Sequence, residues 1–589
     1  MTRAADVVVV GAGWAGSIVA VELARAGLEV ALLERGPRRD PGAGPGFRDE
    51  LGDAVRQGLT QDLSRETWTF RHDRREPALP VRVGGAFRPG EGVGGAGVVW
   101  GGQTWRLLER DLRLGSALAE AGQRPGPDLW ASDWGVAYAD LAPHYETFER
   151  VAGVSGLAGA NPFEAPRSGP YPLPPMPETP LTALFTGAAA GLGLHPFPQP
   201  GGTLPERYTN PYGIARESCT LCGFCAQHAC PAGAKADPSV AVLPAAPDRL
   251  RLLTEATVTR VEAGGGRARG VVYRDAAGVE RRVEARAVVL AAYTLGNVRL
   301  LLLSGLGRPY DPATGAGTLG RAYTFPALVN GVGFFPDRTF ERYAGSTSTG
   351  ACVDDFSAEH FDHGDLGFTG GGLIQCPAAG APPIGSLHVP PGTPSWGAAW
   401  KREAARWYDR VALVHAQGEV LAAPGRHLDL DPAYRDAAGD PLLRITFDWS
   451  EDERRRSRFL AARIEELLRA MGAAQVAIDL PAERPYDVAT YQCTHNAGGA
   501  IMGGDPATSA VDPECRLWEV PNLYVVGASA FPQTPGRNPT GTVGALAYRA
   551  AATIARDLGR TSPARGEVPR TALPRRRGDF TPGAPPGPP

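Results

Sequence analysis

Four cysteines lie close together in the middle of the chain: Cys219, Cys222, Cys225 and Cys230, in the order C-x2-C-x2-C-x4-C-P. Thiolates at such short spacing can surround one compact iron–sulfur cluster, and bacterial ferredoxins use this pattern with one residue fewer before the last cysteine. A structural zinc site usually takes two separated C-x2-C pairs, and disulfides between such close cysteines would be strained. The run therefore favours an iron–sulfur cluster, with zinc and disulfides as the alternatives.

A second chemical pattern, V-V-V-V-G-A-G-W-A-G, starts at residue 7. Its apolar, β-branched residues predict a strand that is buried on both faces of a parallel sheet. Gly11, Gly13 and Gly16 follow at the spacing that lets a tight turn approach a pyrophosphate, with the N-terminus of the next helix facing the phosphates. A second apolar strand ends at Glu34, where a carboxylate binds ribose hydroxyls. The pattern predicts a dinucleotide cofactor on a Rossmann-like fold.

Composition excludes several classes of protein. The chain has 60 Lys and Arg against 63 Asp and Glu, a net charge of −3, which predicts no nucleic-acid partner. No run reaches the roughly 18 to 20 apolar residues of a membrane-spanning helix, so no transmembrane segment is expected. Since the first strand begins by Val7, no export signal is expected before it. The compartment is left open: the cytoplasm, or the periplasm if the folded chain is exported with a signal-bearing partner.

The C-terminal part carries three further blocks: T-H-N-A-G-G-A-I-M-G from Thr494, N-L-Y-V-V-G-A-S-A-F-P from Asn522, and G-R-N-P-T-G-T-V-G-A-L from Gly536. Together with the opening pattern and the loop V-G-G-A-G-V-V-W-G-G, these blocks resemble the glucose-methanol-choline (GMC) oxidoreductase family. The resemblance covers most of the chain and is weakest over residues 310–480. Within the family, the cysteine run is similar to the branch of gluconate 2-dehydrogenase and bacterial FAD-dependent sugar dehydrogenase flavoprotein subunits.

The resemblance implies FAD as the cofactor and two residues beside its reactive edge, His495 and Asn538. Oxidation of an alcohol removes a hydroxyl proton and a hydride, so a neutral imidazole suits the base and an amide can donate to the developing alkoxide. The loop that carries a covalent histidine in some relatives has Val98 and Val99 here, which predicts non-covalent FAD. The cofactor-binding residues expected by resemblance, besides those of the opening pattern, are Gly94, Gly95, Val258, Gly527, Ala528 and Thr540.

For the cysteines, the resemblance implies three ligands to a three-iron (3Fe-4S) cluster: Cys219, Cys225 and Cys230. Cys222 departs from that pattern and either completes a four-iron (4Fe-4S) cluster or is a bystander. With the cluster, the enzyme is a dehydrogenase for a hydroxyl of a sugar, aldonic acid or polyol, passing electrons to an external cytochrome c subunit or quinone, with a small partner subunit. The alternatives are an oxygen-using alcohol oxidase without a cluster and, less favoured, a flavin-containing lyase.

The expected fold class is α/β with an α+β second domain: a Rossmann-like FAD-binding domain and a discontinuous antiparallel-sheet substrate domain, of GMC type. A Pro- and Gly-rich stretch over residues 156–213 predicts extended structure without helix or sheet. His228 is expected to be a solvated loop residue, and the polar residues His415, Gln417 and Glu419 are candidates for the substrate pocket. The expected segments are 1–110 (FAD-binding), 111–218 (extended, and part of the substrate domain), 219–309 (cysteine loop and FAD-binding), 310–480 (substrate), 481–560 (FAD-binding, with the catalytic motif) and 561–589 (a disordered tail).

Overall fold

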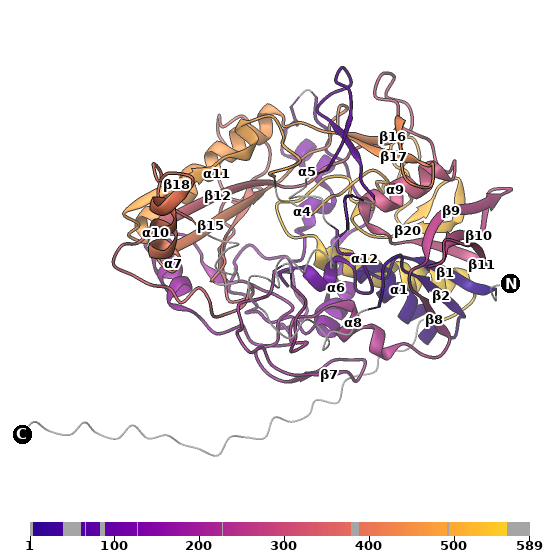
Figure 1. The fold of residues 1–589 in the computed structure, drawn as a ribbon, viewed down its shortest axis with the longest axis horizontal. Coiled ribbons are helices and arrows are strands. Elements are labelled where there is room, and N and C mark those ends of the chain that lie inside the picture. Colours follow the sequence, from indigo (N-terminus) through magenta and orange to yellow (C-terminus); the bar gives the residue numbers. More distant parts are fainter. Residues whose placement is uncertain are drawn as a thin grey trace, which may run out of the picture.

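Distant parts of the chain build one mixed sheet (Figure 1). The computed structural model describes residues 4–38, 61–64, 66–82, 89–126, 128–226, 228–378, 388–491 and 494–561. Five strands in the order β20-β11-β1-β2-β8 are parallel, and β19, β10 and β9 add antiparallel pairs. Their bounds are β1 (Ala5–Val10), β2 (Val30–Leu33), β8 (Leu250–Leu253), β9 (Thr257–Gly264), β10 (Arg267–Arg274), β11 (Glu280–Leu290), β19 (Arg516–Leu517) and β20 (Val520–Val525). The predicted Rossmann-like α/β sheet is confirmed.

Long helices lie beside this sheet. They are α1 (Trp14–Arg25), α6 (Tyr138–Ala152), α9 (Tyr293–Leu303) and α12 (Thr540–Asp557). In Figure 1, α1, α6 and α12 lie next to one another, and α12 contacts both of the others. A Cβ at Gly544 would lie 2.1 Å from a ring carbon of Phe148, so the glycine allows α12 to approach α6 closely. Helix α12 thus packs between α6 and α1, the helix that follows β1.

The middle of the chain forms a second, antiparallel sheet of six strands at the other end of the molecule (Figure 1). Its order is β18-β12-β15-β14-β13-β5, with bounds β5 (Phe197–Pro198), β12 (Ala327–Phe334), β13 (Ala351–Val353), β14 (Gly372–Cys376), β15 (Val411–Gly418) and β18 (Gln475–Asp479). Helix α11 (Glu451–Ala470) covers it, and a Cβ at Gly331 would lie 2.3 Å from Ile464. The expected antiparallel, discontinuous second unit is therefore present.

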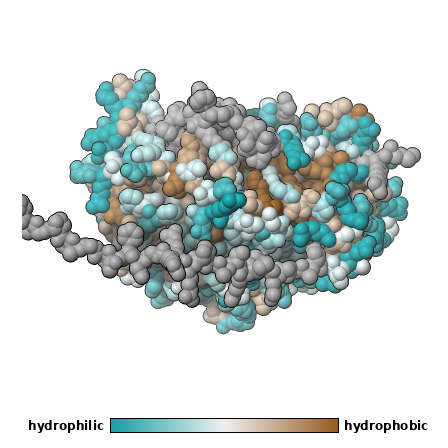
Figure 2. Space-filling model, turned by 90° about the horizontal axis from the view of Figure 1, so that it is seen from below, coloured by the Kyte–Doolittle hydropathy of each residue, from teal (hydrophilic) through white to brown (hydrophobic). Residues whose placement is uncertain are grey.

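Smaller elements complete the described chain. They are the four-stranded sheet β16-β17-β3-β4 and the pair β6-β7, with bounds β3 (Thr69–Arg71), β4 (Leu79–Pro80), β6 (Tyr208–Thr209), β7 (Ala215–Arg216), β16 (His427–Arg435) and β17 (Pro441–Thr446), and the helices α3 (Ala96–Val99), α4 (Glu109–Leu112), α5 (Leu114–Glu120), α8 (Pro238–Ala241) and α10 (Gly397–Trp407). On the face shown in Figure 2, hydrophobic side chains gather toward the middle, between hydrophilic surfaces at either end. Among the described helices, none is both long and apolar enough to cross a bilayer.

The prediction of extended structure over residues 156–213 is wrong for part of that stretch. Helix α7 (Pro180–Gly191) lies within it, as do the short strands β5 and β6. Thr179 caps the helix by accepting a hydrogen bond from the Thr182 amide, and Pro180 occupies the first turn, where a missing N–H costs nothing. The prolines earlier in the stretch indicated extended chain, so the helix start at Thr179 was not recognised from the sequence. The predicted tail lies outside the described residues from residue 562 onward.

Candidate active site

A cavity of about 1090 Å³ lies between the two main sheets. Its wall combines the ends of β1 and β2, the start of α9, the segment after residue 493, and residues of β12 and β15. His495 and Asn538 both line it, as do Gly11 and Gly13 of the opening pattern. The fold therefore joins the predicted dinucleotide-binding end and the predicted catalytic pair in one space.

At one end, glycine backbone forms a cradle. Gly11 has φ +97°, and a Cβ there would lie 2.5 Å from the carbonyl oxygen of Ala291. Gly13 is the N-cap of α1 and adds no side-chain cap, so the first amides of the helix are left for a ligand. A Cβ at Gly95 would lie 3.1 Å from the Cα of Gly13. A Cβ at Gly13 itself would meet nothing within 4 Å, so the space beside this glycine is open to a pyrophosphate.

Glu34 lies directly after β2, and its buried carboxylate lines the cavity. Its oxygens accept hydrogen bonds from the amides of Ala12 and Gly36, both at 2.9 Å. Burial raises the pKa of Glu34, and these amide bonds oppose the rise. The carboxylate is thus held at the position from which it can reach a ribose.

The other predicted cofactor residues divide into two groups. Those on the cavity wall, in addition to Gly11, Gly13 and Glu34, are Gly95, Val258, Gly527, Ala528 and Thr540. Gly16 and Gly94 do not line it. A Cβ at Gly16 would meet the Gly11 carbonyl oxygen at 1.9 Å, and one at Gly94 would meet the Val98 side chain at 2.5 Å. These two glycines allow close packing behind the wall.

His495 is half-buried and faces the cavity. Its Nδ1 atom is buried and has no hydrogen-bond partner among the described residues. Burial, and to a smaller extent the nearby His415, lower the pKa of His495 to about 4. The imidazole is therefore neutral at neutral pH, as a proton acceptor must be.

The amide of Asn538 is oriented by three neighbours. Its Oδ1 accepts hydrogen bonds from Trp105 Nε1 at 2.9 Å and from Gln417 Nε2 at 3.2 Å. Its Nδ2 donates to Gln103 Oε1 at 3.3 Å. An amide nitrogen carries two N–H groups, so the second can donate to an oxygen within the cavity.

The second sheet contributes two of the three polar residues that the sequence offered as candidates for the substrate pocket, and another, Asn330, that it did not. His415 and Gln417 lie two residues apart on β15, hence on one face, and both line the cavity with Asn330 of β12. Burial lowers the pKa of His415 to about 4. The alternation of apolar and polar residues in V-H-A-Q, residues 414–417, was the sequence signal that indicated one polar face of a strand. Glu419, the third candidate, instead forms a buried ion pair with Arg110 at 2.9 Å and does not line the cavity.

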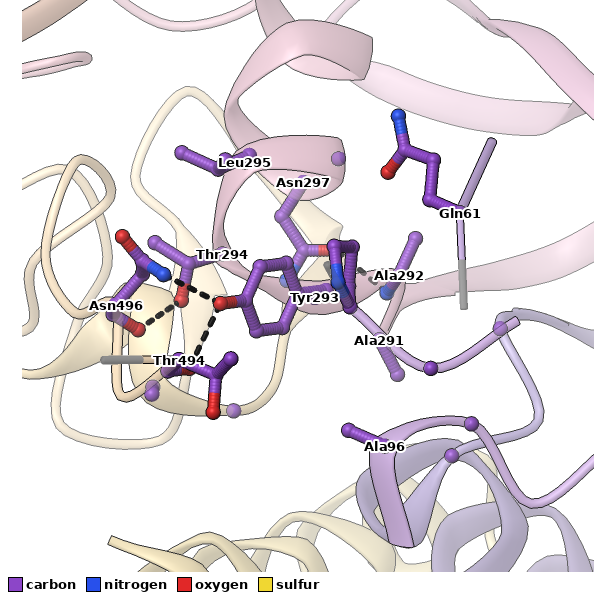
Figure 3. A pocket seen from close by; sticks show the side chains of 18 of the residues that line it. Gln61, Ala96, Ala291, Ala292, Tyr293, Thr294, Leu295, Asn297, Thr494 and Asn496 are labelled. Atoms are coloured by element: carbon purple, nitrogen blue, oxygen red, sulfur yellow. Dashed lines mark hydrogen bonds between the residues drawn. The ribbon is translucent and has the colours of Figure 1, made fainter. Parts of the chain in front are cut away.

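Residues beside His495 are tied to the start of α9 (Figure 3). The Tyr293 hydroxyl donates to the Thr494 carbonyl oxygen at 2.8 Å and accepts from Asn496 Nδ2 at 2.5 Å. Thr294 Oγ1 donates to the Asn496 carbonyl oxygen at 2.6 Å. The segment that carries the imidazole is thus held on both sides.

Three sulfur atoms of the cysteine loop accept hydrogen bonds from backbone amides. The amide of Leu221 donates to Cys219 Sγ at 3.3 Å and that of Lys235 to Cys230 Sγ at 3.4 Å. A third amide, that of Thr347, donates to the Cys225 thiol. These are the three cysteines that the family resemblance implies as ligands.

The thiols lie near enough to influence one another. Burial first, and then the charges of Cys225, Cys230 and Cys222, raise the pKa of Cys219 to about 11. Within the described chain, however, no three His, Cys, Asp or Glu side chains are arranged as a metal site. The seven described cysteines are all free, so the disulfide alternative is not realised among them.

Lys235 joins this loop to the cavity wall. Its buried Nζ donates to the carbonyl oxygens of Val98 at 3.1 Å, Trp100 at 2.7 Å, Cys225 at 2.6 Å and His228 at 2.8 Å. The prediction that His228 is a solvated loop residue is wrong, because it is 7% exposed. Ala226 of the loop lines the cavity itself. The cysteine loop is therefore part of the same site.

Comparisons with known proteins agree with this geometry. Residues 214–321 and 427–547 match the N- and C-terminal domains of GMC oxidoreductases, and residues 6–93 match the family of FAD dependent oxidoreductases. The gluconate 2-dehydrogenase flavoprotein of Pantoea cypripedii is 41% identical over 93% of this chain and 93% of its own. The fructose dehydrogenase large subunit of Gluconobacter japonicus is 28% identical over 95% and 99%. The crystal structure of pyridoxine 4-oxidase from Mesorbium loti shares the fold, with a TM-score of 0.59 and 19% identity over 94% of this chain and 99% of that one.

Proposed function

Because the chain belongs to the GMC oxidoreductase family and is an FAD-dependent oxidoreductase that acts on CH–OH groups, we propose that it is a dehydrogenase for a hydroxyl of a sugar, aldonic acid or polyol. The observation that carries this proposal is the shared cavity wall of the glycine cradle, His495 and Asn538. The names of the gluconate and fructose dehydrogenases support the substrate class.

In this proposal His495 removes the hydroxyl proton. Its lowered pKa keeps the imidazole unprotonated above about pH 4, so it can accept a proton through most of the physiological range. Asn538 donates its second N–H to the oxygen as negative charge develops there, and Trp105 and Gln417 keep the amide from rotating.

The polar face of the second sheet binds the remaining hydroxyl groups. Gln417 Oε1 is buried without a hydrogen-bond partner among the described residues, so a donor from the substrate would satisfy it. His415 and Asn330 lie on the same wall. Uncharged donors and acceptors in this number suit a polyhydroxylated substrate.

FAD, when bound, accepts the hydride from the carbon of the same CH–OH group. The glycine cradle, the N-terminus of α1 and Glu34 would hold its dinucleotide part. Val99 lines the cavity where some relatives carry a covalent histidine, which supports non-covalent attachment. The expected cofactor roles of Gly95, Val258, Gly527, Ala528 and Thr540 belong to this proposal.

We extend the proposal to the electron outlet, by which we mean the route that electrons take from the reduced flavin to an external acceptor. Cys219, Cys225 and Cys230 would hold a three-iron cluster, or a four-iron cluster with Cys222, and such a cluster would supply one-electron transfer to a cytochrome or quinone acceptor. The amide donors to the three sulfur atoms and the position of Ala226 on the cavity wall support this. Because the thiols are not arranged as a metal site, their convergence on iron would accompany cluster insertion. A small partner subunit and a cytochrome subunit would complete the enzyme, and the words "large subunit" in the name of the fructose relative support this assembly.

The test is anaerobic mixing of the purified yellow protein with D-gluconate, D-fructose, D-glucose and D-sorbitol, while absorbance near the flavin maximum is followed. We expect at least one compound to bleach the flavin, and a lyase would leave it oxidised. No bleaching by any of them would contradict the proposed dehydrogenase function. Iron and acid-labile sulfide are assayed in the same sample.

An oxygen-using alcohol oxidase is the second candidate, favoured by the unassembled arrangement of the thiols. The fold does not distinguish a dehydrogenase from an oxidase, since the structurally similar pyridoxine 4-oxidase is named as an oxidase. Oxygen consumption with peroxide release, in protein free of iron, would establish this candidate. Dye reduction much faster than oxygen consumption, in protein that contains iron, would exclude it.

A further inference from the structure

Tyr293 combines an unusual backbone conformation with a place on the cavity wall. It is the first residue of α9 and has φ +66°. A bulky residue in the left-handed region is an outlier and persists only where the surrounding structure enforces it. The turn before it is held, because the Ala292 amide donates to Asn297 Oδ1 at 2.7 Å and Asn297 Nδ2 donates to Ser529 Oγ at 3.0 Å.

This conformation directs the Tyr293 hydroxyl at the two residues that flank His495 (Figure 3). The hydroxyl donates to the backbone of Thr494 and accepts from the side chain of Asn496. The other end of the Asn496 amide accepts a hydrogen bond from Tyr323. The side chain of Asn496 is therefore clamped between two tyrosine hydroxyls.

His495 itself lacks such a clamp. Its Nδ1 is buried without a hydrogen-bond partner in the described chain, so no bond at that nitrogen fixes the rotation of the ring. The position of the imidazole must then follow from the backbone on either side of it. That backbone is what Tyr293 holds.

We propose that Tyr293 is a positioning residue for His495: its left-handed backbone places the hydroxyl so that it fixes residues 494–496, and through them the imidazole, at the reaction centre. The inference rests on the proposed function, in which His495 removes the substrate proton. It adds a residue that lies 202 positions from His495 in the sequence and takes no part in the transfer of the substrate proton. Proton removal depends steeply on distance and angle, so a loosened segment slows the reaction without abolishing it.

The main variant is Tyr293→Phe, which removes the hydroxyl and keeps the ring. We expect the rate constant for anaerobic flavin reduction to fall about 10- to 100-fold, with bound FAD and the concentration of probe at half-maximal rate nearly unchanged. The probe is whichever of D-gluconate, D-fructose, D-glucose and D-sorbitol reduces the wild-type flavin fastest. The matched control is Tyr310→Phe, which removes a bond from a hydroxyl to the Pro424 carbonyl oxygen, outside residues 494–496.

A second measurement requires no substrate. The Ala497 amide bonds to the Thr324 carbonyl oxygen at 2.8 Å, and we expect amide hydrogen exchange in a peptide over residues 494–502 to be faster in Tyr293→Phe than in the wild type or Tyr310→Phe. Tyr293→Asn, which tolerates the left-handed conformation but is too short to reach, should show the same faster exchange in folded protein.

If the wild-type flavin reacts and Tyr293→Phe matches it in both reduction and exchange, the positioning role is overturned while the proposed function stands. If Tyr293→Phe slows reduction but raises the half-maximal concentration by the same factor, Tyr293 binds substrate instead, and the inference is also wrong. If no probe reduces the wild-type flavin, the proposed function fails and this inference fails with it.

Discussion

The His495 segment and the cysteine loop contribute to the same cavity, but the fold holds them in different ways. Around His495, side chains make the contacts, and the groups that would react are neutral and already in place. In the cysteine loop, backbone amides and the ammonium of Lys235 make the contacts. Burial raises the pKa of the Cys219 and Cys225 thiols, and the described thiols are not arranged as a metal site.

The difference follows from charge. Neutral imidazole and amide groups can be positioned by packing and hydrogen bonds without repelling one another. Several thiolates at close range repel: after burial, the charges of the neighbouring cysteines raise the pKa of Cys219. In the proposed function, a bound metal would offset this repulsion and bring the thiolates together. Under the proposed function, the fold alone would prepare proton transfer, whereas the electron outlet would need a metal to complete it.

The largest expected effect is on proton removal at His495. His495→Ala should lower the rate constant of flavin reduction by about 10²- to 10⁴-fold, because a positioned base contributes that much. FAD should remain bound, since the cradle is untouched. Stopped-flow reduction under nitrogen measures the change.

The control for that variant is His72→Ala, a partly exposed histidine that pairs with Glu76 away from the cavity wall. It should react as fast as the wild type. A near-normal rate in His495→Ala would remove that residue from the mechanism. The contrast between the His495 segment and the cysteine loop would then also fail.

The next effect concerns the electron outlet. Cys225→Ser should leave flavin reduction by substrate within a few-fold of the wild type, but should lose iron and most of the electron transfer to cytochrome c or dye, because serine is a poor ligand for iron in a cluster. Iron assay, electron paramagnetic resonance and steady-state dye reduction measure this.

Cys222→Ser is the matched comparison in the same loop. Retention of iron and dye reduction indicates three ligands, and their loss indicates four. Unchanged acceptor reduction in Cys225→Ser would refute the relay.

The smallest effect concerns pH. His415 contributes to the lowered pKa of His495, so His415→Gln should raise the pKa of His495 and move the acid limb of the flavin-reduction profile to higher pH. The sign follows because a protonated imidazole cannot accept the substrate proton: the rate falls once the pH drops below this pKa, and we expect the wild-type limb near pH 4. Gln417→Glu would place a negative charge in the same wall and should shift the limb in the same direction. An unchanged limb in His415→Gln would show that burial alone sets the pKa.

Much of the fold could be predicted because its signals are local. The strand, glycine turn, helix and strand of residues 5–33 lie consecutively, and the apolar periods appear directly in the sequence. Helix α7 was missed because the start signal at Thr179 follows a run of prolines that indicated extended chain. The segment boundaries stay predictions.

The site residues likewise divide into those indicated by a local motif and those that only the structure revealed. His495 and Asn538 stand in short motifs, and the structure puts both on one wall, although their roles stay predictions. Polarity alone suggested His415 and Gln417 for the substrate pocket, together with Glu419, which does not line the cavity. Tyr293 could not be chosen from sequence, because an ordinary helix-start position carries no sign of what faces it.

The sequence by itself determined which groups could do chemistry: a glycine turn without side chains, one imidazole, one amide and four thiols at fixed spacing. These depend on residue type and on neighbours a few positions away. Only the tertiary structure decided that Tyr293 clamps residues 494–496, that β15 presents His415 to His495, and that Lys235 ties the cysteine loop to the cavity wall. Such contacts join segments from 80 to about 200 residues apart, and they arise from burying two sheets against a common cavity, which no local pattern encodes.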